Sequence, residues 1–184
     1  MPASAPRRRD GAASRERLLR AACELFADRG FDRTTARDIG ERAGVDPALI
    51  ARYFGSKAQL YIEALNAETG TDLPADLLEP GRLEEVVRRV DRRGAGPLHQ
   101  AIVWPYDDPA AQAAALEAVQ RRVVAPMRDR LAADGDPRPD LQAELLTAAV
   151  VGVLLARRTG TLQALATADA DDVASALARL VGRG

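Results

Sequence analysis

Apolar residues recur along this chain at the spacing of amphipathic helices. Between residues 15 and 29 they return every three or four positions and so fall on one helical stripe. The residues of this stripe are Leu18, Leu19, Ala22, Leu25 and Phe26. Ser14 can cap the start of the helix and Gly30 can end it, so the pattern predicts a first helix over 15–29.

The stretch that follows breaks the helical pattern after a short run. Thr35 and Asp38 have the spacing of a capping box, in which a hydroxyl and a carboxylate satisfy free amides at a helix start. Gly44 can take the positive φ that often ends a helix. These three residues predict a second helix over 36–43.

A third short helix is predicted directly after this turn, over 47–54. Asp46 can cap it, and Pro47 suits the first helical position, where its missing N–H costs nothing. Helices this short are unstable alone in water, so packing must hold both of them. The apolar residues available for that packing are Ile39, Ala43, Val45, Leu49 and Ile50. Two such helices around a glycine turn are typical of a helix-turn-helix, whose second helix can enter the major groove of DNA.

Helical spacing continues to the end of the chain, and strand-like alternation is absent. Ser56 and Gln59 repeat the capping-box spacing and open a fourth helix. Pro126 should kink or split a later helix. The later helices are predicted near 82–92, 97–104, 109–133, 140–159 and 171–181. The chain is therefore predicted to be all-α, with about nine helices.

The predicted helices group into two domains behind a short basic tail. Residues 1–13 contain an arginine run and are predicted to be a disordered tail. Residues 14–70 form the predicted DNA-binding domain, with the helix-turn-helix at about 35–54. Residues 71–184 form a predicted helical domain for effector binding and dimerisation.

Composition excludes several kinds of function. The chain of 184 residues is 47% hydrophobic and 29% charged, which suits a soluble protein with a core. Cys23 is its one cysteine and His99 its one histidine, so no intrachain disulfide or multi-thiolate metal site can form. The carboxylates lack the spacing of metal ligands. We therefore expect no enzyme activity, no metal and no cofactor.

The hydrophobic segments favour a cytoplasmic protein without a membrane partner. The longest apolar run, residues 148–156, is too short to cross a bilayer and is followed by two arginines. The basic residues near the N-terminus precede no apolar core, which argues against a secretory signal.

Charge is distributed unevenly although the net charge is only −1. Residues 1–66 hold 12 Lys and Arg against 9 Asp and Glu, whereas the rest of the chain holds 14 against 18. The basic front third favours a polyanionic partner for that part of the chain.

The stretch RERLLRAACELFADRGFDRTTARDIGERAGVDPALIARYFGSKAQL resembles the N-terminal DNA-binding domain of TetR-family transcriptional regulators. The resemblance rests on LFADRGF, TTARDIGERAGV and YFGSKAQL in the family's order and spacing. It implies a homodimer, a near-palindromic DNA operator and a variable all-helical C-terminal domain that binds a small molecule. The C-terminal part is similar to domains common among actinobacterial members.

The resemblance also implies which residues meet DNA. Base-facing positions of the third helix correspond to Pro47, Ala48, Leu49 and Arg52, and Arg37 corresponds to a position that often reaches a base. Small apolar side chains can contact thymine methyls, and Arg52 can bind either guanine or a phosphate.

Positions that contact the DNA backbone correspond to Thr34, Thr35, Tyr53 and Lys57. The alternatives are that Thr35 only caps its helix, that Tyr53 only packs and that Lys57 is solvated.

Two residues depart from the family pattern. Ala51 stands where many members carry an aromatic, and Asp46 replaces a common Ser or Thr, which places a carboxylate near phosphates.

The C-terminal half is expected to dimerise and to bind an unidentified small-molecule effector. Helices 140–159 and 171–181 can pair with their symmetry mates, because their Ala, Gly and Val surfaces permit close packing. The alternative is that their apolar residues serve only the core of one chain. His99, Trp104, Tyr106 and Met127 are the candidate pocket residues, with ordinary core packing as the alternative for each.

The sequence thus predicts a DNA-binding transcriptional regulator, a repressor released by a ligand that favours a differently spaced dimer. Activation stays open, because the operator's position relative to a promoter is not encoded in the chain. A helical protein-interaction module that has lost DNA binding is the alternative reading.

Overall fold

The computed structural model describes residues 6–68 and 76–181, and within these ranges every regular element is helical. The all-α prediction is therefore confirmed. The chain forms two compact units, one from residues 1–70 with 96–116 and the other from 71–95 with 117–184. Residues 96–116 thus join the first unit rather than the second, because they pack on its helices.

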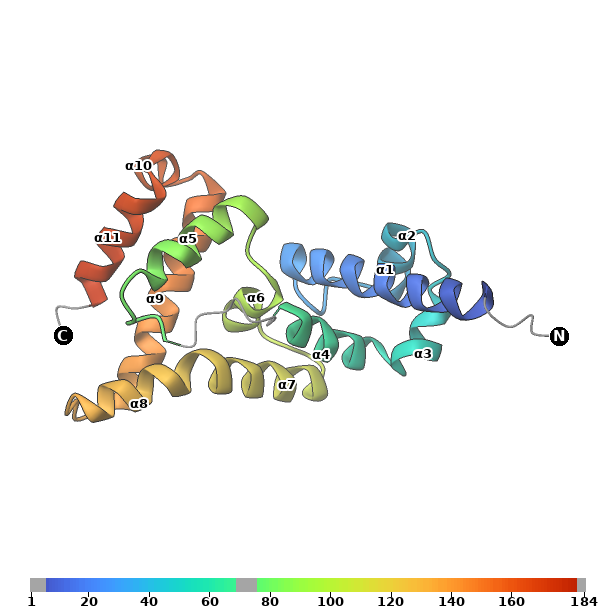
Figure 1. Ribbon diagram of the computed structural model, residues 1–184, viewed down its shortest axis with the longest axis horizontal. Helices are drawn as coiled ribbons and strands as arrows, with labels where there is room; N and C mark the ends of the chain where they lie inside the picture. Colours follow the sequence, from blue (N-terminus) through green and yellow to red (C-terminus); the bar gives the residue numbers. More distant parts are fainter. Residues whose placement is uncertain (1–5, 69–75, 182–184) are drawn as a thin grey trace. The chain divides into compact units, whose positions relative to one another are not determined.

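The first unit is built around α1, which contacts the four other complete helices of the unit. Figure 1 shows α1 running alongside α4, with α2 and α3 gathered towards the N-terminal end of α1. The helices of this unit are α1 (Pro6–Arg29), α2 (Ala36–Ala43), α3 (Ala48–Phe54), α4 (Lys57–Glu68), α6 (Pro97–Val103) and most of α7 (Pro109–Val119).

An apolar core with an aromatic cluster holds these helices together. Phe26 packs edge-on against Tyr61, with ring centroids 5.0 Å apart, and Phe31 and Tyr106 extend the cluster. The apolar residues of this unit that are at most 1% exposed are Leu18, Ala22, Phe26, Ile39, Leu60, Tyr61, Ala64, Leu65 and Ala111. Burial of this apolar area is what stabilises α2 and α3, which are too short to be stable alone.

The start of α1 corrects one prediction. The helix begins at Pro6 rather than at 15, so residues 6–13 are helical and not a disordered tail. Ser14 lies inside the helix instead of capping it, and its hydroxyl accepts a hydrogen bond from Arg17 at 3.3 Å. Alanine and arginine favour helix more than the single Gly11 opposes it, which explains the longer helix. Residues 1–5 of the predicted tail lie outside the described residues.

The second unit packs α11 against α5 and α8 against α9. Arg157 of α9 joins three of its elements: it donates to both carboxylate oxygens of Asp91 on α5 at 3.0 Å and to the Leu165 carbonyl. The hydrogen bond that Arg157 donates to Asp91 raises the pKa of Arg157. The helices of this unit are α5 (Arg82–Arg93), the end of α7, the π-helical turn η1 (Gln120–Val124), α8 (Ala125–Ala133), α9 (Pro139–Thr159), α10 (Gln163–Thr167) and α11 (Ala170–Val181).

Pro126, predicted to kink or split its helix, lies just after a change in helical geometry. The π-helical turn η1 separates α7 from α8, and Pro126 lies in the first turn of α8. Proline has no N–H and its ring crowds the preceding turn, and a wider turn relieves that crowding. If α7, η1 and α8 are counted as one continuous helix, the described ranges hold ten helices. The helix that the sequence did not predict is α10. It has only five residues and buries no side chain, so it shows no repeating apolar pattern.

Helix α9 is 21 residues long and, within the described ranges, the one helix long and apolar enough to cross a membrane by length and composition alone. Core helices of soluble proteins pass the same test. In α9, Ala143, Val150 and Leu154 are buried against the rest of its unit.

Candidate nucleic-acid interface

The start of α2 has the capping box that the sequence predicts. The Thr35 hydroxyl accepts from the Asp38 amide at 3.1 Å, and the Asp38 carboxylate accepts from the Thr35 amide at 2.9 Å. The hydrogen bond from the Thr35 amide is the main reason that the pKa of the Asp38 carboxyl is below its usual range. The Thr35 hydroxyl lowers this pKa further. The box fixes an exposed helix N-terminus, the kind of helix end at which phosphates bind.

A tight turn joins α2 to α3. Gly44 takes the left-handed conformation with φ 61°, and the Val45 amide donates to the Gly40 carbonyl at 3.0 Å. The carboxylate of Asp46 accepts from the Ala48 amide at 2.9 Å, just ahead of α3. Helix α3 begins at Ala48, one residue later than predicted, so its N-cap is Pro47 and not Asp46. The predicted glycine turn is therefore confirmed, whereas the predicted cap position is shifted by one residue.

Gly40 is a residue that the sequence reasoning missed. A Cβ placed there would lie 2.8 Å from the Val45 carbonyl oxygen and 2.9 Å from two carbons of the Pro47 ring. A side chain at this position would therefore push α2 away from the turn. Its sequence signal is a glycine inside a short predicted helix, which indicates close backbone approach.

Helix α3 turns one side to the core and one side to solvent. Ile50 and Phe54 are buried, whereas Leu49 and Tyr53 are half-buried. The exposed residues at its start and on its outer side are Pro47, Ala48, Ala51 and Arg52. The outward surface is small and apolar apart from one guanidinium group, whose carbon lies 5.9 Å from the centre of the Tyr53 ring. Such a surface can approach base edges closely.

Arg37 projects from the first turn of α2. Its side chain is 84% exposed, and its Nε donates to the Glu41 carboxylate at 2.8 Å. This hydrogen bond, together with the charge of Glu41, raises the pKa of Arg37. The guanidinium group is charged and accessible, as a DNA-contacting arginine must be.

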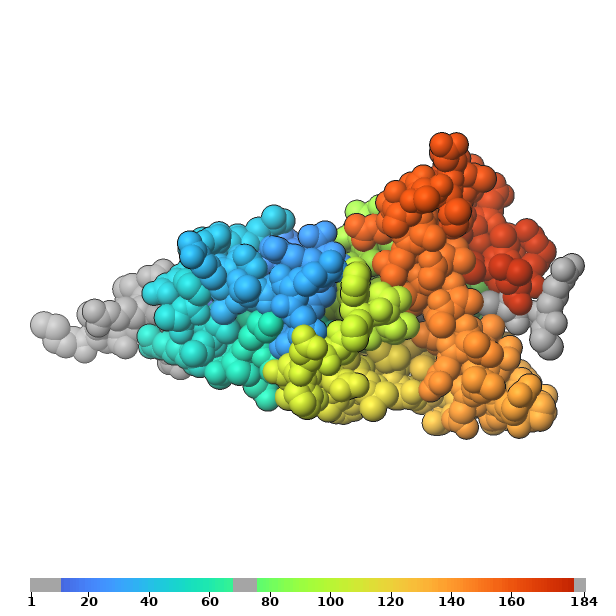
Figure 2. Space-filling view, turned by 180° about the vertical axis from the view of Figure 1, so that it is seen from behind, coloured from blue at the N-terminus to red at the C-terminus, as the bar shows by residue number. Residues whose placement is uncertain are grey.

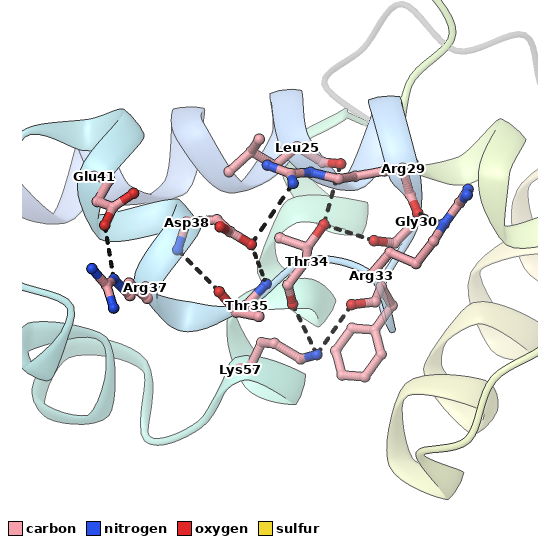
Figure 3. A network of polar contacts seen from close by, with 11 residues as sticks. Leu25, Arg29, Gly30, Arg33, Thr34, Thr35, Arg37, Asp38, Glu41 and Lys57 are labelled. Atoms are coloured by element: carbon pink, nitrogen blue, oxygen red, sulfur yellow. Dashed lines mark hydrogen bonds and ion pairs between the residues drawn. The ribbon is translucent and has the colours of Figure 1, made fainter.

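Thr34 does not fit the predicted contact with DNA. Its side chain is fully buried, and its hydroxyl donates to the Gly30 carbonyl at 2.7 Å, with the Leu25 carbonyl 3.3 Å away. Figure 3 shows the hydroxyl pointing towards the end of α1, away from Thr35. The buried Thr34 side chain therefore cannot reach a phosphate. Its physical task is to anchor the loop before α2.

Lys57 is a structural tie as well as a candidate contact. Its ammonium group donates to the Phe31 carbonyl at 3.1 Å and the Thr34 carbonyl at 3.0 Å, and it lies 3.9 Å from the Phe31 ring centre. Partial burial lowers the pKa of Lys57, and the charges of Asp32 and Asp108 oppose that shift. Lys57 is thus not simply solvated. Two of its three donors bind the loop, which leaves one for a phosphate.

The four candidate ligand-binding residues do not come together in one unit. His99 is buried in α6, and Trp104, at the end of α6, is 45% exposed beneath the guanidinium group of Arg33 at 4.1 Å. Tyr106 shares a 2.6 Å hydrogen bond with Tyr61 of α4. Met127 is fully buried in the second unit. Core packing and surface stacking therefore account for these side chains.

Two hollows in the second unit are lined by other residues. One, of about 230 Å³, lies among α9, α10 and α11 and has an apolar lining that includes Val153, Leu165 and Leu177. The other, of about 360 Å³, lies between the loop before α5 and Ala178. None of the four candidate residues lines either hollow. Within the described ranges, no three His, Cys, Asp or Glu side chains lie close enough together to hold a metal ion.

Curated relatives match about two fifths of the chain. The HTH-type transcriptional repressor Rv3405c of Mycobacterium tuberculosis is 39% identical over 77 residues, which are 42% of this chain and 40% of that protein. The HTH-type transcriptional repressor BdcR of Escherichia coli is 35% identical over 85 residues, 42% of this chain and 43% of that protein. The chain thus spans about two fifths of the length of these relatives.

A solved structure has the same fold along nearly the whole chain. NalD of Pseudomonas aeruginosa, the secondary repressor of the MexAB-OprM multidrug efflux pump, aligns with a TM-score of 0.64 at 22% identity. The alignment covers 95% of this chain and 96% of that one.

Two family models match the chain directly. The model described as bacterial regulatory proteins, tetR family, matches residues 18–64, which include α2 and α3. The model described as tetracyclin repressor-like, C-terminal domain, matches residues 81–183, more than half of the chain. Together the two models cover the helix-turn-helix and the helical region behind it, and the chain belongs to the tetR family of bacterial transcriptional regulators.

Proposed function

We propose that this chain is a cytoplasmic, homodimeric repressor that binds a near-palindromic DNA operator and is released from it by a small molecule. The observation that carries the proposal is the orientation of α3. Its inner side is buried at Ile50 and Phe54, while Pro47, Ala48 and Arg52 are open to solvent. A short helix held in this way can enter a major groove without rearrangement of its own domain.

Few side chains of the helix-turn-helix would contact the bases. Arg52 and Arg37 are the exposed guanidinium groups of the helix-turn-helix that suit guanine, and each bidentate pair contributes about 1–3 kcal/mol of discrimination. Pro47, Ala48 and the half-buried Leu49 offer apolar contact to thymine methyl groups. The operator should therefore combine thymines with one or two guanines in each half.

Backbone contacts would fix the helix in the groove. The exposed N-terminus of α2, with the Thr35 hydroxyl beside it, suits one phosphate, and the third donor of Lys57 suits another. The half-buried Tyr53 can add a phenol hydroxyl. One carboxylate oxygen of Asp46 accepts a hydrogen bond from the Ala48 amide. This bond reduces the repulsion between the Asp46 charge and a nearby phosphate.

The second unit would supply the dimer contact. Helix α9 exposes Leu141, Leu145, Ala148 and Gly152 at the spacing of one helical face, and Figure 2 shows its orange surface open to solvent. A Cβ added at Gly152 would meet nothing within 4 Å, so the fold of one chain does not require this glycine. Glycine weakens a helix, and close approach of a second helix would explain its presence. A two-fold dimer places two recognition helices about 34–36 Å apart, one turn of DNA.

Footprinting of the DNA beside the protein's own gene, followed by gel shifts at several salt concentrations, tests this function. We expect a saturable complex on one near-palindromic fragment and a steep loss of affinity as salt rises. Arg52→Ala should weaken that complex about tenfold or more, in line with the loss of one base contact.

Arg121→Ala is the matched control, because it removes an exposed arginine from the second unit. It should leave the complex unchanged. A chain that binds every fragment equally, or none, would be no operator-specific regulator. Candidate small molecules added to the footprinted complex then test release.

A further inference from the structure

The ion pair of Arg37 and Glu41 occupies only one edge of the arginine fork. Nε of Arg37 donates to Oε1 of Glu41 at 2.8 Å, and both side chains are mainly exposed, at 84% and 64%. A guanidinium group presents five N–H donors in a fixed plane. With Nε engaged, the two terminal nitrogens Nη1 and Nη2 can still face outward together (Figure 3).

The order of the two charges along α2 is the unfavourable one for a helix. Arg37 lies in the first turn, where the helix dipole disfavours a cation, and Glu41 follows four residues later. The pair of Glu117 and Arg121 has the same spacing in the opposite, favourable order. Exposed pairs contribute little stability in either order. Helix stability therefore gives no reason for this arrangement, and a breach of a local rule of this kind is expected at functional sites.

From this geometry we propose that Glu41 is a positioning residue for base reading: it holds Nε of Arg37 so that Nη1 and Nη2 meet O6 and N7 of a guanine. The proposal rests on the DNA-binding function given above. A free arginine would have to lose its rotamer entropy on binding, whereas a held one has lost part of it already. Two terminal nitrogens in one plane match the two acceptors that guanine presents in the major groove.

Glu41 has a second effect, because its carboxylate repels phosphates. A sequence without the guanine gains no base contact, yet it still brings its phosphates near this negative charge. Glu41 thus favours the correct site by orienting Arg37 and disfavours the others by repulsion, two separate sources of specificity.

Two substitutions of Glu41 separate these effects. Glu41→Gln removes the charge but keeps an oxygen that can accept from Nε, whereas Glu41→Ala removes both. The measurement is the dissociation constant for the footprinted operator, for operators with each G·C pair replaced by A·T, and for a random-sequence duplex of equal length. Arg37→Ala identifies the relevant base pair as the one whose replacement then costs no further affinity.

Wild type should discriminate against the replaced base pair about tenfold or more. Glu41→Ala should reduce this ratio to about twofold, and Glu41→Gln should retain most of it, while both bind the random duplex more tightly than wild type does. Glu117→Gln, in the matched pair of the second unit, should change neither value. Equal helical circular dichroism of all variants would show that folding is not the cause.

Two negative results are distinguishable. If wild type binds the operator specifically and Glu41→Ala keeps the wild-type ratio, the role of Glu41 is wrong and the proposed function stands. If wild type forms no specific complex, both the function and this role are wrong.

Discussion

Gly40 and Pro47 approach so closely that a Cβ on the glycine would lie 2.9 Å from the proline ring. The same Cβ would lie 2.8 Å from the Val45 carbonyl oxygen, which is backbone and cannot move aside alone. The angle between α2 and α3 therefore depends on glycine, which has no side chain, at position 40.

Gly40→Ala should destabilise the first unit by about 1–3 kcal/mol, the usual cost of overpacking, and should weaken DNA binding because α3 shifts. Urea unfolding and operator gel shifts measure the two effects. Gly11→Ala is the matched control: in α1 the added Cβ would lie 3.6 Å from the Tyr53 hydroxyl, an ordinary contact. It should stabilise the protein by about 0.5–1 kcal/mol. Equal stability of both variants would contradict the role given to Gly40.

Local signals in the sequence were sufficient to predict the helix-turn-helix. The capping box of Thr35 and Asp38 and the turn at Gly44 involve residues at most a few positions apart, and both features are confirmed. The π-helical turn before Pro126 follows from the chemistry of one residue, although the helix continues through it. Such features depend on the neighbouring chain and can be found without knowledge of the packing.

Features that depend on the path of the chain could not be predicted in the same way. Thr34 and Thr35 are adjacent and carry the same hydroxyl, yet the loop buries one and exposes the other. The two carbonyls that bind Lys57 belong to residues 26 and 23 positions away. Trp104 and Met127 are residue types that often line ligand pockets, but the path of the chain places them in different units. The DNA contacts of Thr35, Arg37 and Arg52 stay predictions.

Lys57→Met tests whether Lys57 both ties the loop and contacts DNA. Loss of two charged hydrogen bonds to the Phe31 and Thr34 carbonyls should cost about 1.5–3 kcal/mol or more of unfolding free energy. Loss of one phosphate contact should also reduce the slope of log affinity against log salt by about 0.9. Urea unfolding and a salt titration of the operator complex give the two values.

Lys57→Arg is the companion variant, since it keeps the charge and can still donate to both carbonyls. It should retain most of the stability and the salt slope. An unchanged slope in Lys57→Met, with reduced stability, would restrict Lys57 to its structural role.

Tyr106 should make the protein sensitive to alkaline pH. Burial raises the pKa of the Tyr106 phenol, although its hydrogen bond to Tyr61 acts in the other direction. In the unfolded chain the phenol ionises near pH 10, as usual. As pH rises past that value the unfolded state loses its proton first, so the free energy of unfolding falls.

Tyr106→Phe keeps the ring and removes the ionisable group. At pH 7 it should cost about 1 kcal/mol for the lost hydrogen bond to Tyr61. Above pH 10 the difference from wild type should shrink, because only wild type pays for keeping this phenol protonated. Urea unfolding of both proteins between pH 7 and 11 gives the comparison, and a constant difference over that range would contradict the raised pKa.

Leu145→Arg tests the dimer contact proposed for α9. Leu145 is 55% exposed on the same helical face as Leu141 and Gly152, where a second copy would bury it. A charge at the centre of such a contact has no partner and should prevent association, because burying an unpaired charge costs several kcal/mol. Analytical ultracentrifugation should find a dimer for wild type and a monomer for the variant. Since the position is exposed in the single chain, helical circular dichroism should not change.

Leu116→Arg is the control for that experiment, because Leu116 is an exposed leucine too, at 62%, and lies in the first unit. It should remain a dimer. A monomeric Leu145→Arg protein should also bind a full operator much more weakly than wild type, while its affinity for a single half-site should be unchanged, since its recognition helix is intact. A Leu145→Arg protein that is still dimeric would move the interface to another face of the second unit.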